Sequence, residues 1–134
     1  PNLGMDKTLA LALGYAHSCA LDAPDRVRCW GASTYGTVGQ GNVLQIGDNE
    51  TPDSVPAVDV GVPVAQITAN WYQVCARGKD FSVRCWGRSE YGQLGYGNLN
   101  NIGDDELPSA AWQAPCSWQV VTWAILSLAL YNSS

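Results

Sequence analysis

Four cysteines are spaced so that they can form two covalent cross-links. Cys19 and Cys29 lie at equal separations on either side of Pro24, and Cys75 and Cys85 lie in the same way about Asp80. If each pair sits on a hairpin that turns at these residues, the two Cβ atoms face each other across the strands at about 4.5–5.5 Å, close to disulfide range. Two cross-strand disulfides are therefore the favoured interpretation, and they imply an oxidising compartment.

Two other interpretations of these cysteines stay open at the level of sequence. The four thiols can be reduced, buried and apolar, or they can hold zinc, although the short Cys-x-x-Cys spacing of a zinc ribbon is absent. The fifth cysteine, Cys116, is left over after these two pairs. It is expected to be a free thiol or to link two chains.

His17 is the single histidine of the chain. The favoured interpretation is structural, with a backbone carbonyl as partner. A functional role requires several chains, because copies of His17 that converge near a shared axis would form a zinc site or supply a base. A nucleophilic Cys–His pair is a further alternative: residues i and i+2 share a strand face, so His17 can contact Cys19 if that thiol is free, and Cys116 is a second candidate.

The segment "NLNNIGDDE" places Asp104, Asp105 and Glu106 side by side. Carboxylate oxygens are ligands for a hard cation such as calcium, so this loop is a candidate metal site. The ligand spacing of an EF-hand is absent. A solvated acidic loop with Asx turns is the favoured interpretation.

Composition and motifs exclude several function classes. The net charge is −5 and the pI is near 4.5, so the surface repels phosphate backbones and we expect no nucleic-acid partner. The longest apolar run, Val120–Leu130, is too short for a membrane span, which needs about 20 residues. The sequence contains no nucleophile elbow, P-loop or dinucleotide fingerprint.

The chain repeats itself. Residues 9–52 align with residues 65–108, and "VRCWGASTYGTVGQGN" in the first copy becomes "VRCWGRSEYGQLGYGN" in the second. Glycine, cysteine and tryptophan carry much of the match, and these residues serve backbone geometry rather than general hydrophobicity. The segments 1–64 and 65–108 are therefore interpreted as two structural repeats, followed by an atypical apolar tail over 109–134.

Each repeat is expected to consist of short strands. "SCAL" and "VRCW" alternate in polarity, and "DAPDR" and "GKDFS" have turn composition. Lys7–Ala16 is interpreted as a strand rather than a signal peptide. A unit of roughly 50 residues with about four strands has the size of one propeller blade. Trp30 and Trp86 are expected to pack between blades, and core packing is favoured over a surface groove for Trp71 and Tyr72. The predicted class is all-β, with two propeller-blade-like repeats.

The motifs resemble a known family. "GYAHSCAL" at Gly14–Leu21, "VRCWG" in both repeats and "YGQLGYG" at Tyr91–Gly97 are similar to the regulator of chromosome condensation repeat, in the cysteine-containing form of bacterial surface or secreted proteins. The resemblance implies a propeller that closes with about seven blades, of which this sequence covers two. It also implies an extracellular or periplasmic location.

Two blades leave open faces and strand edges, which are sites of association. We therefore expect a homo-oligomer of three or four chains that completes a propeller-like ring, with Val120–Leu130 as an interface strand. The expected function is that of a binding or structural propeller fragment. The alternative is a metal-dependent hydrolase of activated esters or phosphoesters, whose site forms between chains from His17 copies or the acidic loop.

Overall fold

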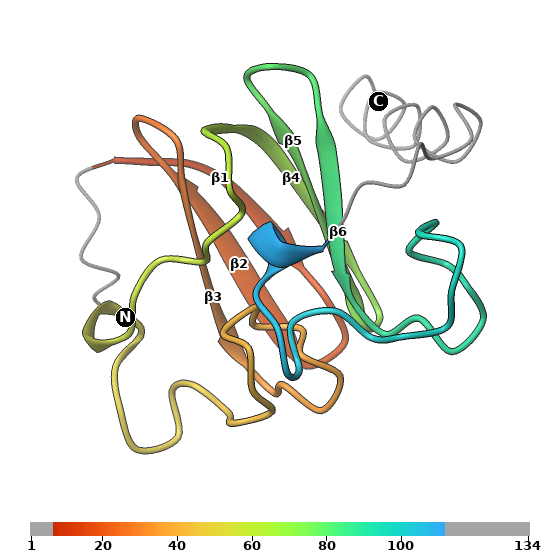
Figure 1. The fold of residues 1–134 in the computed structure, drawn as a ribbon. Coiled ribbons are helices and arrows are strands. Elements are labelled where there is room, and N and C mark those ends of the chain that lie inside the picture. The colour runs from red at the N-terminus through yellow and green to blue at the C-terminus, as the bar shows by residue number, and fades with distance from the viewer. Residues whose placement is uncertain (1–6, 112–134) are drawn as a thin grey trace.

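The computed structural model describes residues 7–111 of the chain. Six strands in this range form two antiparallel three-stranded sheets, each ordered as its strands follow along the chain (Figure 1). The first sheet contains β1 (Thr8–Leu13), β2 (His17–Asp22) and β3 (Arg26–Gly31). The second sheet contains β4 (Val64–Asn70), β5 (Gln73–Gly78) and β6 (Val83–Gly87). The predicted all-β class is confirmed.

Two short 3₁₀ turns, η1 (Pro52–Ser54) and η2 (Pro108–Ala110), complete the regular structure at matching places in the two repeats. Each has proline at its first turn, where the missing N–H is not needed for an internal hydrogen bond. Within residues 7–111, no helix is long and apolar enough to cross a membrane. Cys116 and the apolar segment Val120–Leu130 lie outside the described residues.

The strand content of each repeat differs from the prediction of about four strands. The segment that follows each sheet makes only one bridge to it, from Gly31 to Ile46 in the first repeat and from Gly87 to Ile102 in the second. Gly87 has φ +105°, and a Cβ atom there would lie 2.2 Å from the carbonyl oxygen of Tyr72. This glycine turns the chain away from β6, and the pairing does not continue into a fourth strand.

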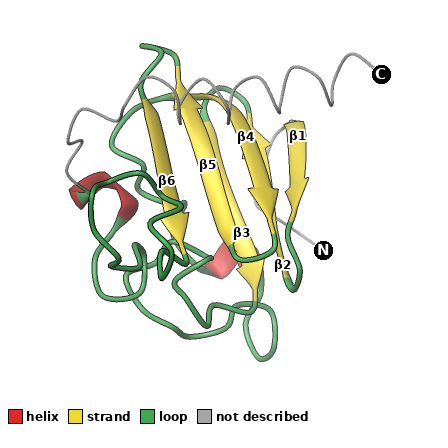
Figure 2. Ribbon diagram, turned by 90° about the vertical axis from the view of Figure 1, so that its right-hand side faces the viewer, coloured by secondary structure: helices red, strands yellow, loops and turns green. Residues whose placement is uncertain are grey.

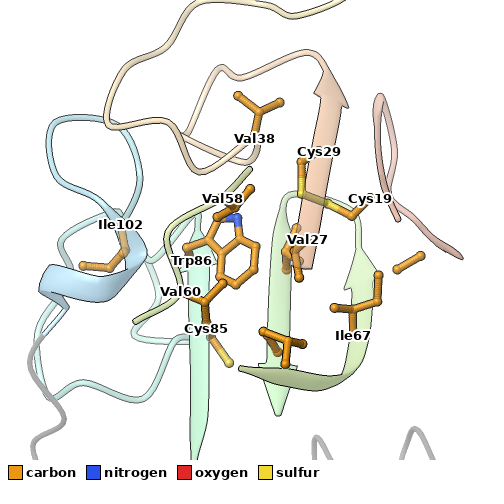
Figure 3. Close-up of a cluster of buried hydrophobic side chains, with 14 of the residues drawn as sticks. Cys19, Val27, Cys29, Val38, Val58, Val60, Ile67, Cys85, Trp86 and Ile102 are labelled. Carbon is orange, nitrogen blue, oxygen red and sulfur yellow. A yellow bond between two sulfur atoms is a disulfide. The ribbon is translucent and has the colours of Figure 1, made fainter. Parts of the chain in front are cut away.

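The two sheets lie face to face, with β4 against β1 and β2 (Figures 1 and 2). The space between them is filled by valine, isoleucine, leucine, cysteine and tryptophan side chains, shown in part in Figure 3. The linker between the sheets contributes Val58 and Val60 to the same cluster. The hydrophobic core therefore lies between the repeats and belongs to neither alone.

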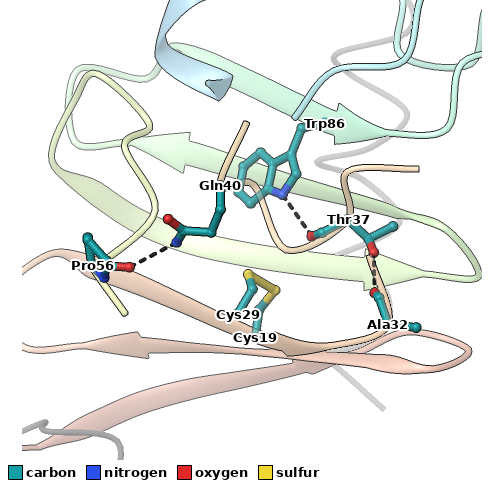
Figure 4. Close-up of a disulfide and its surroundings, with 7 residues drawn as sticks. All are labelled: Cys19, Cys29, Ala32, Thr37, Gln40, Pro56 and Trp86. Atoms are coloured by element: carbon teal, nitrogen blue, oxygen red, sulfur yellow. Dashed lines mark hydrogen bonds between the residues drawn. A yellow bond between two sulfur atoms is a disulfide. The ribbon is translucent and has the colours of Figure 1, made fainter. Parts of the chain in front are cut away.

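Trp86 of β6 is the largest fully buried side chain of this core. Its Nε1–H donates a hydrogen bond of 3.0 Å to the backbone oxygen of Thr37, in the loop that follows β3 (Figure 4). The hydroxyl of Thr37 donates to the oxygen of Ala32 and holds that loop in turn. Trp86 thus packs between the repeats, as predicted. Its equivalent Trp30 is only partly buried.

Candidate functional site

The four cysteines of residues 7–111 form the two predicted disulfides. Cys19 pairs with Cys29 and Cys75 with Cys85, each across neighbouring strands with a Cα–Cα distance of 4.1 Å. The reduced and zinc-bound alternatives are therefore wrong for these residues. The pairing of His17 with a free Cys19 thiol is wrong as well, because that sulfur is bonded to Cys29.

His17 opens β2 and is almost completely buried. The imidazole makes a hydrogen bond with the backbone of Gln73 in the second sheet, and burial lowers the pKa of His17 below its usual value. Its Nε2 atom has no hydrogen-bond partner among the described residues. Gly14 leaves room for the ring, since a Cβ atom there would lie 2.1 Å from the imidazole. In one chain, His17 thus joins the two repeats, and its role in a shared metal or base site stays a prediction.

The carboxylates of Asp104, Asp105 and Glu106 gather in the loop that follows the Gly87–Ile102 bridge. One oxygen of each lies within 4.8 Å of the others. Partial burial, a hydrogen bond with Asp105 and the charges of Asp105 and Asp104 raise the pKa of Glu106 to about 7. His17 does not belong to this group. Calcium binding at this loop stays a prediction.

A second cluster, which we call the seam patch, joins aromatic rings of both repeats. Its centre is a run of ring contacts: Trp71 stacks on Tyr15 at 5.8 Å, Tyr15 contacts Tyr72 at 5.7 Å, and Tyr72 meets Tyr35 edge-on at 5.1 Å. The guanidinium of Arg88 lies over three rings, 5.0 Å from Tyr35, 5.8 Å from Tyr72 and 5.4 Å from Tyr91. The seam patch consists of Tyr15, Tyr35, Trp71, Tyr72, Arg88 and Tyr91.

The turns that carry the seam patch are fixed by backbone hydrogen bonds. The N–H of Tyr15, between β1 and β2, donates to the oxygen of Trp71, between β4 and β5. The N–H of Arg88 donates to the oxygen of Tyr72. The seam patch therefore lies at the ends of the strands, where the two repeats meet.

Sequence reasoning missed most of this patch. Core packing was expected for Trp71, but its side chain is 71% exposed. The sequence gives no separate signal for Tyr35, Arg88 and Tyr91, because they follow the strands at repeat positions that suggest only turns. The available clue was the pair of consecutive aromatic residues Trp71 and Tyr72 after Asn70, in a turn where burial is limited.

Equivalent faces of the two sheets have different surroundings. In the second sheet, Ile67, Ala69 and Trp86 lie on the face that packs against the first sheet. The equivalent residues of the first sheet are Leu11, Leu13 and Trp30, by the alignment of the repeats. Leu11 is 62% exposed and Leu13 is 67% exposed. The first sheet therefore leaves two leucines of β1 exposed on the face whose counterpart packs against the other sheet.

An open cleft lies at the opposite end of the strands from the seam patch, between β3 and the linker. It is lined by Asp25, Arg26 and Val27 and by residues 57–64. Half of residues 57–64 are valines, and the cleft contains neither His17 nor the group of Asp104, Asp105 and Glu106. It gathers no set of residues with an evident chemical role.

The comparisons with known proteins agree on one family. A model of the regulator of chromosome condensation (RCC1) repeat matches residues 9–37. The human probable E3 ubiquitin-protein ligase HERC4 is 31% identical over 99 residues, which are 74% of this chain and 9% of that protein. The ultraviolet-B receptor UVR8 of Arabidopsis thaliana is 30% identical over 97 residues, or 72% of this chain and 21% of that protein. The chain thus spans only a small part of these relatives.

Solved structures show the same fold. Human WBSCR16 superposes with a TM-score of 0.59 at 24% identity, over 75% of this chain and 25% of that one. Yeast RCC1 (Prp20), in a structure with Kap60 bound, gives 0.60 at 20% identity, over 80% of this chain and 24% of that one. Both likenesses concern the propeller blades. With the repeated motifs, the paired sheets and these relatives together, the chain belongs to the RCC1 repeat family of β-propeller proteins.

Proposed function

We propose that this two-blade propeller fragment is a binding or structural module that assembles with further copies of itself. The observation that carries the proposal is the open apolar face of the first sheet. Leu11, Leu13 and Trp30 occupy the positions of Ile67, Ala69 and Trp86 in the second sheet, where Ile67 and Trp86 are buried and Ala69 is partly buried. A strand face with this composition is an association site unless another layer covers it.

The interface inside the chain supports a definite partner for this face. In the present structure, the sheet face that carries the Cys19–Cys29 disulfide packs against the face that carries Trp86. The second sheet has an equivalent disulfide face, on which Thr68 and Cys75 are only partly buried. That face of one chain therefore matches the open Trp30 face of the next. Repetition of such a head-to-tail contact closes into a ring, and three or four copies would supply six or eight blades.

The oligomeric mass tests self-assembly directly. Native mass spectrometry of the unreduced protein is expected to show trimers or tetramers, and Leu11→Asp is expected to dissociate them because it places a charge on the interface. Leu44→Asp is a matched control, since Leu44 is 70% exposed and lies outside the strands, in the loop that follows β3. A monomeric wild type at all concentrations, or equal behaviour of the two variants, would contradict the proposal.

An oxidising location is the second part of the proposal. Both disulfides close hairpins, and such bonds persist in extracellular or periplasmic compartments. Propellers are general binding platforms, and the yeast relative is known in a structure with Kap60 bound. We infer that this chain also acts by binding, through surfaces its own residues build.

A further inference from the structure

We propose that the seam patch is a binding site for a neutral carbohydrate, with Trp71 and Tyr15 as the stacking surface and Arg88 with Glu90 as the hydroxyl-binding pair. The inference concerns the strand ends rather than the open sheet faces, and it does not depend on self-assembly.

The exposure of the rings is the first argument. Tyr15 is 69% exposed, Trp71 is 71% exposed and Tyr91 is 80% exposed, so these side chains bury little when the chain folds. Rings that served only to join the repeats would be expected to lie between them, as Trp86 does. Clustered exposed tyrosine and tryptophan are typical of binding surfaces, because each offers a large apolar face and a polar atom.

The polar groups among the rings form the second argument. Nε and one terminal nitrogen of Arg88 both donate to Oε2 of Glu90. The guanidinium has five N–H groups in all, and the Glu90 side chain is 47% exposed, so further donors stand beside a carboxylate that can still accept. A site with adjacent donors and acceptors matches a ligand whose groups each donate and accept, and vicinal sugar hydroxyls have this property.

The Arg88–Glu90 pair also disfavours two other classes of ligand for the seam patch. A polyanion is disfavoured because the Glu90 carboxylate is bonded to Arg88, the cation of the site, and the whole chain carries a net charge of −5. A proline-rich peptide can stack on tyrosine and tryptophan, but proline has no N–H, so its segments offer mainly carbonyl acceptors and leave Glu90 without a donor. A pyranose stacks its C–H face on an aromatic ring and presents hydroxyls at its edge. A pyranose therefore satisfies both parts of the patch.

Affinity electrophoresis with defined polysaccharides tests this site. The full chain would be run in native gels that contain laminarin, xyloglucan, galactomannan or dextran. At least one glycan is expected to retard the wild type, and Trp71→Ala is expected to abolish the retardation. Glu90→Gln is expected to weaken binding about tenfold, as the loss of one charged hydrogen bond implies. Trp71→Phe, which keeps a ring, is expected to retain part of the binding.

Phe81→Ala is the matched control. Phe81 is 76% exposed and carries Arg77 over its ring, at the other end of β5 from Trp71. This variant is expected to bind as the wild type does, and thermal unfolding shows that each variant is folded. The proposal is overturned if none of the four glycans retards the wild type, if Trp71→Ala binds normally, or if a proline decamer binds at Trp71 in a fluorescence titration while the glycans do not.

Discussion

The two blades share one backbone plan but differ in what covers them. The second blade buries Trp86 completely against the first, whereas Trp30, at the same position of the first blade, is only partly covered. The disulfides show the reverse pattern: Cys19 and Cys29 are buried, and Cys75 is partly exposed. Burial in a repeat protein is thus set by the neighbour that each face meets, and identical motifs contribute differently to stability according to their place in the stack.

The largest effect is expected from truncation of the two tryptophans. Trp86→Ala removes a fully buried ring and its hydrogen bond to Thr37, and it should lower the free energy of unfolding by about 3–5 kcal/mol. Trp30→Ala, on the open face, should cost on the order of 1 kcal/mol in the monomer. Urea unfolding of both variants, followed by circular dichroism, measures the difference.

Both tryptophan variants should be made in the Leu11→Asp protein, because this substitution is expected to prevent association through the face that holds Trp30. The two losses of stability are then compared in a monomer. In the wild-type protein, which is expected to assemble, Trp30→Ala should lower the free energy of unfolding by more than it does in the monomeric Leu11→Asp protein. Equal losses for the two tryptophans in the Leu11→Asp background would show that the open face is not open in solution.

Much of the fold was predictable from the chain because the repeat carries it in backbone-specific residues. The positions of Cys19 and Cys29 about Pro24 were enough to predict the hairpin and its disulfide, and the structure pairs them directly. The alternation in "VRCW" correctly predicted β3 and β6. These features are local, so short sequence separations determine them.

The functional surface was harder to predict because it depends on contacts between repeats. Nothing in the sequence places Tyr15 beside Trp71, and their stack exists only because two turns of different blades meet at one seam. The preference for core packing at Trp71 followed from its size and apolar character. Within residues 7–111, no further layer covers the turn between β4 and β5, and the ring stays exposed.

The next effect concerns the two disulfides. Each closes a loop of the same sequence separation, 10 residues, so replacing either pair by alanine should cost about 3 kcal/mol through the greater entropy of the unfolded chain. Their reactivity should differ, because only the Cys75–Cys85 pair has a partly exposed member, Cys75. Reduction under native conditions, followed by alkylation and mass spectrometry, should label Cys75 and Cys85 before Cys19 and Cys29.

A control with unfolded protein separates exposure from local chemistry in that experiment. Unfolding in urea before reduction should make the two pairs react at the same rate, because the protection of Cys19 is then lost. Simultaneous labelling of both pairs in the native protein would mean that the first hairpin opens as readily as the second, and the burial contrast would have no kinetic consequence.

The smallest effect is expected from a polar difference between the repeats at the seam, His17 in the first blade against Gln73 in the second. Burial lowers the pKa of His17 from its ordinary value of 6.5, so the unfolded chain takes up a proton more readily than the folded one. The contribution of His17 to stability is complete above pH 6.5 and is lost as the pH falls below that value. His17→Gln should therefore flatten the loss of stability in acid, and urea unfolding from about pH 7.5 to about pH 5 measures it.

The contribution of Glu106 to stability changes with pH in the opposite direction to that of His17, over part of the same pH range. The analysis of the experiment must therefore separate the two groups. Its pKa is raised from 4.5 to about 7, so its neutral form suits the folded state, and its contribution is lost as the pH rises through 7. The total pH profile mixes the two groups. The difference between wild type and His17→Gln at each pH removes the contribution of Glu106, which both proteins share. If that difference does not change between pH 7.5 and pH 5, the imidazole is not protonated differently in the folded and unfolded chain, and its burial at the seam carries no pH dependence.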